Sequence, residues 1–518
     1  MSTPIPGSAL AKDRLGVPSV IFFVMSAAAP LTVIAGVISI GYLNTGVPGI
    51  PFAYIVMPLI LAIFAIGYVA MSRHITNAGA FYTYVAHGLG RPLGVGTAWM
   101  SLLAYNGLQV GLYGIIGTAA SAPLQRLGID PPQWWVTALI VWAVVGILGI
   151  LRVDINGKVL AVLLCAEIAI VLVYDLAFLT KPGEAGVTLE PFNPANLFGT
   201  DVGGLPAAGA VLVLAFLGFT GFESSVVFSE ESKNPKRTIA LATFLSLVII
   251  GATYAVSAWA MSVATGPANL VDTLGSMEDP TLYIFDQAGT RISSVFVDIG
   301  SVLFMTSVLA ASISFHNTVA RYTFALGRER VFPVALGSTG RRSGAPLGGS
   351  LLQSGIGLVV ILLVLAFGLD PVLHLFFYGG NGGGFGVMLM ITLTSLAVIF
   401  FFARDQRGES LLARVIAPAI AFILLAAVVY FAVDGFGNLL APPPGSPDEF
   451  FTAADYAAWM IPALYPVVGL LGVIYAFILK AVRPEVYQAI GLGANTSTGL
   501  TTASRVEVPV GVGSSSSS

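Results

Sequence analysis

Long apolar stretches alternate with short polar segments along most of the chain. A helix needs about 20 apolar residues to cross the hydrocarbon core of a bilayer, and twelve stretches reach or approach that length. They are 17–40, 50–72, 93–121, 133–151, 157–180, 206–229, 238–263, 293–321, 349–368, 371–402, 412–433 and 458–480. The pattern predicts an all-α polytopic membrane protein with twelve transmembrane helices.

The composition excludes several other classes of protein. Of 518 residues, 56% are hydrophobic and 9% are charged, whereas about 25% of a soluble domain is charged. The single cysteine, Cys165, rules out a disulfide within the chain and a cysteine-rich metal site. A net charge of -3 argues against a nucleic-acid partner. We therefore predict that the protein is embedded in the lipid bilayer. No soluble segment is large enough to house an enzyme site.

Positive charge sets the predicted orientation, because cytoplasmic loops are enriched in Lys and Arg. With the N-terminus in the cytoplasm, only Arg126, Lys181 and Arg291 fall in outer loops, and the other 20 of the 23 basic residues lie inside. We therefore predict a multi-pass protein of the cell membrane with both termini cytoplasmic. A short segment, 1–16, precedes the first span, and the Gly- and Ser-rich tail 487–518 is expected to be disordered.

Residues 209–237, GAVLVLAFLGFTGFESSVVFSEESKNPKR, combine an acidic residue with an interrupted apolar helix. Gly218 and Gly221 break the helix, and Glu223 follows them. A carboxylate at membrane depth is costly and usually lines a substrate or ion pathway. Unwound backbone is tolerated at that depth only where it lines a cavity. The sequence therefore predicts a discontinuous transport helix with a coupling group beside the break.

The first span carries a matching interruption at Ser26-Ala27-Ala28-Ala29-Pro30, five spans before the sixth. An odd offset gives the two units opposite topology in the membrane. The pair of breaks therefore predicts inverted repeats, 17–180 and 206–402, with the last two spans, 412–480, peripheral. Close helix packing by small residues would explain either break alone, but the pair favours transport.

Three segments carry a resemblance to a known family. FLGFTGFESSVVFSEESKNPKRTI resembles the sixth helix and following loop of permeases of the amino acid–polyamine–organocation superfamily. NAGAFYTYVAHGLGRPLGVGTAW is similar to its second-helix region, and ARYTFALGRERVFP to the cytoplasmic end of its eighth helix. The resemblance covers about residues 15–483 and implies a LeuT-type fold of five plus five helices. The first helix departs from the family pattern, since many members have a Gly-rich break there.

The broken helices predict where a substrate binds. Free N–H groups suit a carboxylate and free C=O groups suit an ammonium, so the two breaks match a zwitterionic amino acid. Aromatic faces can cap the ammonium, and the resemblance places Phe315 over the substrate. Helix packing is the alternative role for these positions. The predicted substrate-binding residues are Ser26, Ala27, Ala28, Ala29, Pro30, Tyr105, Asn106, Phe216, Gly218, Phe219, Thr220, Gly221 and Phe315.

Glu223 and Glu167 are the predicted proton-coupling residues. Glu223 resembles the acidic residue that follows the break in proton-coupled family members, and a buried carboxyl can exchange a proton near neutral pH. Glu167 resembles in position a lysine that one proton-coupled branch of the family carries, and a carboxylate there would favour a cation or a proton instead. A purely structural hydrogen bond is the alternative for both. Ser307, Ser312 and Ser314 leave sodium open as the coupling ion, and no other metal or cofactor is predicted.

Together these features predict a secondary active transporter that imports an amino acid or related amine, coupled to a proton, by alternating access. The altered first helix motivates one alternative, a permease for a decarboxylated amine such as ethanolamine or a polyamine. An amino acid exchanger is another. A channel would need a continuous pore lined by rings of charges or carbonyls, and the chain offers only two deep acidic residues. The sequence leaves the oligomeric state open.

Overall fold

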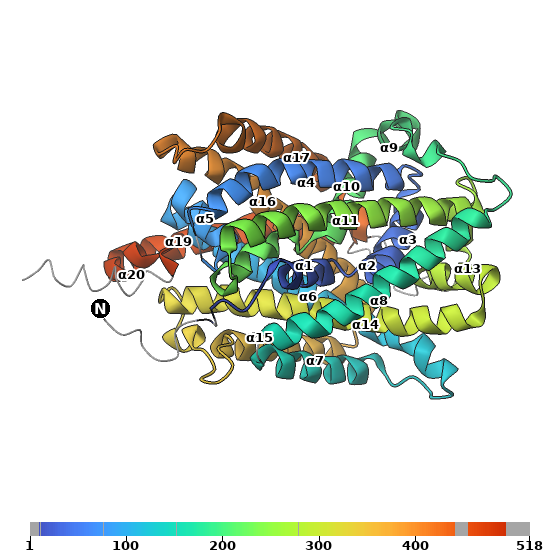
Figure 1. Ribbon diagram of the computed structural model, residues 1–518, viewed down its shortest axis with the longest axis horizontal. Coiled ribbons are helices and arrows are strands. Elements are labelled where there is room, and N and C mark those ends of the chain that lie inside the picture. Colours follow the sequence, from blue (N-terminus) through green and yellow to red (C-terminus); the bar gives the residue numbers. More distant parts are fainter. Residues whose placement is uncertain are drawn as a thin grey trace, which may run out of the picture.

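The computed structural model describes residues 10, 12–75, 77–151, 153–277, 279–440 and 454–493. This part of the protein is a bundle of long helices that run along its longest axis (Figure 1). The unbroken long helices are α4 (Ile50–Ser72), α6 (Arg91–Arg126), α7 (Trp134–Ile150), α8 (Val153–Thr180), α11 (Pro235–Thr265), α14 (Ser294–Arg328), α15 (Leu347–Ala366), α16 (Asn381–Arg404), α17 (Ala417–Asp434) and α19 (Ala454–Val482). A π-helix precedes α16, η7 (Val372–Gly380), and another precedes α17, η8 (Leu412–Ile416).

Short helices cover the two ends of the bundle. They are α5 (Ala80–Gly88), α9 (Ala195–Phe198), α12 (Leu270–Gly275), α13 (Tyr283–Arg291), α18 (Phe436–Leu440), α20 (Pro484–Ala489) and the 3-10 turns η2 (Glu190–Phe192), η3 (Thr200–Val202), η5 (Pro280–Leu282) and η6 (Val334–Gly337). One end carries α5 and α20, and the other carries α9 and α13 (Figure 1). We name them the inner and outer ends after the predicted orientation, which stays a prediction.

Each predicted span coincides with a helix. Among the described residues, 10 helices are long and apolar enough to cross a membrane. The third and fourth predicted spans are α6, with 36 residues, and α7, a shorter apolar helix of 17 residues. The predicted all-α polytopic fold is therefore confirmed, with a helix at each of the twelve predicted spans. The grouping into repeats 17–180 and 206–402, with 412–480 peripheral, stays a prediction.

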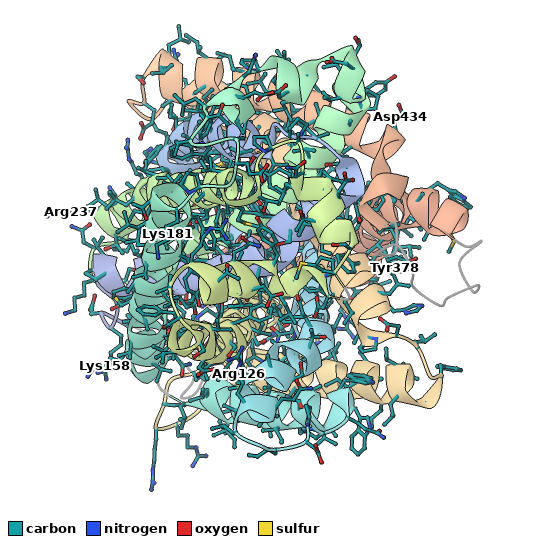
Figure 2. The ribbon with its side chains drawn as sticks, turned by 90° about the vertical axis from the view of Figure 1, so that its right-hand side faces the viewer. Arg126, Lys158, Lys181, Arg237, Tyr378 and Asp434 are labelled. Atoms are coloured by element: carbon teal, nitrogen blue, oxygen red, sulfur yellow. The ribbon has the colours of Figure 1, made fainter. Side chains whose placement is uncertain are left out.

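The sides of the bundle are apolar where helices face outward. Ile140 of α7, Ile423 of α17 and Leu470 of α19 are each more than half exposed, as suits side chains in contact with lipid tails. Figure 2 looks along the bundle from the outer end and shows the basic side chains of Lys158 and Arg237 pointing outward at its rim. This surface agrees with the predicted bilayer surroundings.

The first span is broken at Ala29. Helix α1 (Val17–Ala28) ends there because Pro30 has no N–H group to continue the hydrogen-bond ladder. Ala29 adopts φ +47°, a left-handed conformation that is rare for a residue other than glycine. The chain resumes as α2 (Pro30–Thr32), the π-helix η1 (Val33–Ile38) and α3 (Ser39–Thr45).

The sixth span is broken at Thr220 and Gly221. Helix α10 (Gly204–Phe219) ends at an extended Thr220, and Gly221 follows with φ +114°. The chain continues as a 3-10 helix, η4 (Phe222–Glu231), of 10 residues, longer than such helices usually run. A Cβ at Gly221 would lie 2.4 Å from the Cβ of Ala27. The predicted breaks in helices 1 and 6 are therefore confirmed, and they touch each other.

The chain ends require one correction. Disorder was expected from residue 487, but the helix α20 continues to Ala489 and the backbone is described through Gly493, because this segment packs on the inner end of the bundle. The rest of the tail, 494–518, lies outside the described residues. Of the N-terminal segment 1–16, the described part includes Leu15, whose N–H group and carbonyl bond to Glu231 and Lys233.

Candidate functional site

A small cavity of about 50 Å³ lies at the first break, beside the end of α10. Helices α6, α10 and α14 and the π-helices η1 and η7 complete its walls. It is large enough for a few waters. The lining residues are Ala27, Ala28, Ala29, Thr32, Val33, Val37, Leu108, Gly111, Leu112, Leu217, Phe315, Phe376 and Gly380. Thr32 is the only polar side chain among them, so the cavity has apolar walls.

The structure brings several predicted residues to this cavity. Ala27, Ala28 and Ala29 form its floor at the first break, and Phe315 contributes an aromatic wall from α14. Ser26 and Pro30 are buried beside them, and the Ser26 hydroxyl has no hydrogen-bond partner within the described structure. The first break and the eighth span therefore meet as the sequence predicts.

The residues of the sixth break serve mainly to pack and hydrogen-bond the break itself. Phe216 is fully buried, and Phe219 contacts the rings of Tyr54 and Tyr254 instead of the cavity. Gly218 lies close to Tyr254 and to Val33, with no room for a Cβ. The Thr220 N–H donates to Leu217 O (3.2 Å) and its hydroxyl to Phe216 O (3.4 Å).

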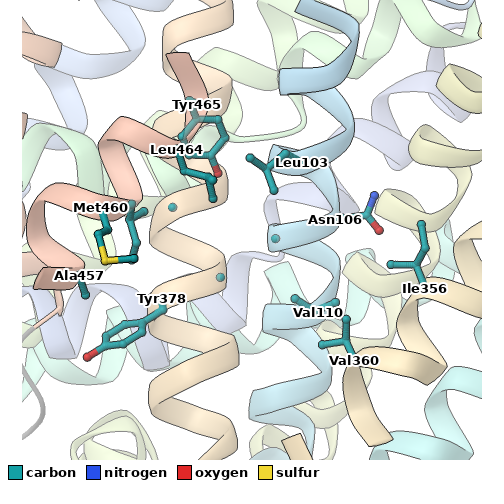
Figure 3. Close-up of a pocket in the computed structure, with 14 residues that line it drawn as sticks. Leu103, Asn106, Val110, Ile356, Val360, Tyr378, Ala457, Met460, Leu464 and Tyr465 are labelled. Carbon is teal, nitrogen blue, oxygen red and sulfur yellow. The ribbon is translucent and has the colours of Figure 1, made fainter. Parts of the chain in front are cut away.

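Asn106 lines a different cavity from Ala27, Ala28, Ala29 and Phe315. Successive residues on a helix point about 100° apart, so Tyr105, Leu108 and Leu112 share one face of α6 while Asn106 faces away. There it lines a larger cavity of about 500 Å³ between α6, α15, α16 and α19 (Figure 3). Its amide nitrogen donates to Leu102 O (2.8 Å).

Glu223 is held at the sixth break by both of its carboxyl oxygens. It is 1% exposed. Oε1 accepts a hydrogen bond from the Tyr105 hydroxyl (2.6 Å), and Oε2 accepts from the Gly221 N–H (2.9 Å). The Tyr68 hydroxyl donates to its backbone oxygen (2.8 Å). Since the Tyr105 ring lies beside Phe315, with 6.3 Å between centroids, the carboxyl is connected to the cavity wall through one side chain.

Glu167 is held at the first break in a similar way. The side chain reaches from α8 to α2 and is 1% exposed. It hydrogen-bonds to the Ser307 hydroxyl and accepts from the Leu31 N–H, whereas Oε2 has no partner within the described structure. Thr32 completes the cluster, because its N–H and hydroxyl both donate to Ser307 Oγ (3.4 and 3.0 Å).

Each break is thus already bonded to a carboxylate of the chain itself. The N–H of Leu31 at the start of α2 bonds to Glu167, and the N–H of Gly221 at the start of η4 bonds to Glu223. The N–H groups at the start of a helix favour a negative group. The side chains that supply it are the two acidic residues that the sequence places deepest in the membrane.

The sequence prediction missed several residues that the structure assembles here. Leu31 and Thr32 form the first turn after Pro30, where N–H groups lack helical partners, and that position could have identified them. Phe376 and Leu217 reach the cavity from η7 and α10, and nothing in their local sequence distinguishes them from packing residues. No cluster of three or more His, Cys, Asp or Glu side chains suited to a metal ion occurs among the residues that the structure describes.

Comparison with known proteins identifies the family. The amino acid permease family model matches residues 19–488. The chain is 26% identical over 371 residues to the low-affinity putrescine importer PlaP of Escherichia coli (strain K12), covering 70% of this chain and 75% of that protein. It is 23% identical over 314 residues to the branched-chain amino acid permease BcaP of Lactococcus lactis subsp. cremoris (strain MG1363), covering 57% of this chain and 64% of that one.

A relative from a eukaryote matches as well. Over 339 residues the chain is 23% identical to cationic amino acid transporter 3, mitochondrial, of Arabidopsis thaliana, covering 62% of this chain and 52% of that protein. The family consists of transporters and not of enzymes, and it implies a small-molecule substrate, an amino acid or an amine. The helix order, the two breaks and the match across nearly the whole chain lead to one assignment: the chain belongs to the amino acid permease family of the amino acid–polyamine–organocation superfamily.

Proposed function

We propose that this permease imports a small amine without an α-carboxylate, such as a monoamine or diamine, coupled to a proton by alternating access. The observation that carries the proposal is that Glu167 and Glu223 already occupy the N–H groups of Leu31 and Gly221. A substrate carboxylate was expected to bind free N–H groups at these two breaks. An amino acid would have to displace a carboxylate of the chain, whereas an amine would not.

The charges around the cavity also favour a cation. Two buried carboxyl groups flank it, and its lining contains no basic side chain. A buried negative charge is costly unless it is paired. The unpartnered Oε2 of Glu167 offers a hydrogen-bond acceptor to an ammonium group, and the face of Phe315 offers a cation–π contact. A third carboxylate at this place would be repelled.

The walls suit a hydrocarbon chain attached to that ammonium. Val33, Leu108, Leu112 and Phe376 give contacts to methylene groups and no further hydrogen bonds. The relative named as a putrescine importer handles a diamine, which supports the proposed substrate class. The cavity of about 50 Å³ is smaller than ordinary ligand sites of about 300–1,000 Å³, so the site must widen to admit a substrate.

A neutral amino acid with an apolar side chain is the second candidate. The same apolar walls would accept its side chain, and one relative is named a branched-chain amino acid permease. In that case the substrate carboxylate must replace Glu167 or Glu223 at a break. The two candidates therefore differ in a single functional group, the carboxylate.

Glu223 is the proposed proton carrier. Its carboxyl bonds directly to the backbone of the break and, through Tyr105, to a ring beside the cavity wall. Gain of a proton removes one acceptor site, so it weakens the bond to either Gly221 or Tyr105. Protonation is thereby linked to the geometry of the sixth break, as coupling requires.

Uptake into proteoliposomes with an inward proton gradient tests the proposal. Two matched pairs differ only in the carboxylate: ornithine with putrescine, and leucine with 3-methylbutylamine. We expect saturable uptake of the amines, abolished by a protonophore, and little uptake of the acids. Preferential uptake of leucine would overturn the amine proposal in favour of the second candidate. Uptake driven by a sodium gradient at equal pH would overturn proton coupling, and absence of counterflow would favour a channel.

A further inference from the structure

Glu329 is a buried carboxylate at the inner end that takes no part in the central cavity. It directly follows α14 and is 0% exposed. A glutamate is almost never fully buried unless its carboxylate is paired. Its Oε1 accepts from the Asn77 amide (3.2 Å) and the Gly493 N–H (2.8 Å). Its Oε2 accepts from the Gly491 N–H (2.8 Å) and from the Tyr82 hydroxyl. Burial raises the pKa of Glu329, and these four bonds oppose the rise.

Two of the four donors come from the C-terminal segment, and both are glycines. Gly491 has φ +84° and Gly493 has φ +58°, conformations that glycine adopts readily. A Cβ at Gly493 would lie 2.6 Å from the Asn77 amide nitrogen, and one at Gly491 would lie 3.1 Å from the His87 ring. The two glycines of Gly-Leu-Gly at 491–493 therefore suit their positions for two independent reasons. They adopt the positive φ angles readily, and they leave no Cβ to collide with Asn77 or His87.

Further contacts hold the same segment against the bundle. The Arg91 guanidinium donates to Gln488 O (3.2 Å) and lies over the Tyr487 ring, 5.7 Å from its centroid. The Lys480 ammonium lies 5.8 Å from the same centroid. We call residues 484–493 the C-terminal clasp.

The clasp joins a network that ties the inner ends of several spans together. The Ala78 N–H, just before α5, donates to Glu230 of η4 (3.1 Å), and Glu230 pairs with Arg328 of α14 (2.7 Å). Next to it, Glu231 forms a fully buried pair with Arg321 (2.6 Å). The partners of Glu230 and Glu231 therefore both come from α14.

The N-terminal segment belongs to the same network. The backbone N–H groups of Arg14 and Leu15 both donate to Glu231 O (2.9 and 3.0 Å). The segment before α1, the half-helix η4, the loop before α5 and the end of α14 are therefore all linked at the inner end. A path from the central cavity to the inside requires some of these elements to separate.

We infer that the C-terminal clasp docks on Glu329 to hold the inner end closed, and that its release is a step in opening the substrate site to the cytoplasm. Withdrawal of Gly491 and Gly493 would leave a buried carboxylate with only two of its four donors, which is unfavourable while that end stays closed. Closure and docking therefore stabilise each other. The inference does not depend on which substrate is carried.

Cysteine labelling tests this directly, because the chain has one native cysteine, Cys165. In a Cys165→Ala background, Ser229→Cys places a reporter in η4 beside Glu230. Ser229 is 1% exposed, and its hydroxyl has no partner within the described structure, so the change is conservative. The measurement is the rate of labelling by a membrane-impermeant thiol reagent applied to the cytoplasmic face of inside-out vesicles.

Two variants remove the docking in different ways. In Glu329→Gln, the side-chain NH2 group faces N–H or O–H donors whichever way the amide is turned, because both oxygens of Glu329 accept hydrogen bonds. The second variant, a chain that ends at Ala489, lacks both glycines. We expect each to label at least about ten-fold faster than the parent, with no further gain when they are combined. The matched controls are a chain ending at Gly493 and Glu409→Gln, whose partners are Arg73 and His74. Both should label at the parental rate.

Labelling of the Ala489 truncation at the parental rate would overturn the inference, and so would equal acceleration by the Gly493 truncation. If Glu329→Gln fails to fold, the two truncations still decide the matter. Because the readout needs no substrate, its failure is distinguishable from failure of the proposed amine transport.

Discussion

The two breaks solve the same structural problem with different residues. At the first, Pro30 ends α1 and Ala29 takes a left-handed conformation; at the sixth, Gly221 takes it. Each exposes an N–H group that a carboxylate of the chain accepts. The difference lies in the carboxylates, because both oxygens of Glu223 are bonded while Glu167 keeps Oε2 without a partner within the described structure.

That difference suggests a division of labour between the two sites. Glu223 is held rigidly between the backbone and Tyr105, so a change in its protonation acts on the break. Glu167 has a free acceptor beside Thr32, which lines the cavity. Under the proposed function, the sixth break responds to the proton and the first break attracts the ammonium.

The largest effect is expected from adding a side chain at the sixth break. Gly221→Ala places a Cβ 2.4 Å from that of Ala27 at φ +114°. Left-handed strain of about 1–2 kcal/mol and overpacking of about 1–3 kcal/mol should together lower the stability of the protein by several kcal/mol. Thermal unfolding in detergent measures it. Gly355→Ala on α15 is the control, because nothing lies within 4 Å of the added Cβ; an equal loss there would contradict the steric argument.

Removal of the acid at the sixth break should abolish coupling. One coupled proton allows about ten-fold accumulation for each unit of pH difference, since 1.4 kcal/mol corresponds to a factor of ten. Glu223→Gln cannot exchange the proton, so gradient-driven accumulation should vanish while substrate counterflow persists. Tyr105→Phe keeps the carboxyl and should retain accumulation. Accumulation in the glutamine variant with unchanged pH dependence would disprove the role of Glu223.

The matching change at the first break should affect affinity instead. Glu167→Gln removes a charged acceptor, and a hydrogen bond to a charged group contributes about 1.5–3 kcal/mol. The half-saturation concentration for the amine should therefore rise about 10- to 100-fold, with pH dependence retained. Uptake assays at several pH values measure the half-saturation concentration and its pH dependence for Glu167→Gln and for Glu223→Gln. Equal loss of pH dependence in both variants would end the proposed division of labour.

The smallest effect is expected from relaxing the first break. Ala29→Gly relieves a left-handed alanine at φ +47°, but the added freedom of the unfolded chain offsets the gain. The free energy of unfolding should change by less than about 1 kcal/mol, in contrast to Gly221→Ala. Thermal unfolding again measures it. A loss of several kcal/mol would mean that the alanine methyl group has a packing role of its own.

Local properties of the chain were sufficient to predict the membrane class, the twelve spans and the two breaks. Hydropathy needs only about 20 consecutive residues to register, and Pro30 and Gly221 alter the backbone wherever they stand. The position of Glu223 beside a break followed from the same local sequence. The hydrogen-bond partners of the buried carboxyl groups did not follow from local sequence. Glu167 and Leu31, like Glu329 and Gly491, are far apart along the chain.

Only the tertiary structure decided which groups remain available for a substrate. The sequence allowed free N–H groups at both breaks. Packing of α8 against α2 brings Glu167 to the N–H of the first break, and the turn at Gly221 brings Glu223 to that of the sixth. Packing likewise turned Asn106 toward a separate cavity and ordered the chain through Gly493. The physical reason is that hydrogen-bond satisfaction in a dry interior is a property of the assembled bundle, whereas the tendency to span a membrane or to break a helix resides in a few neighbouring residues.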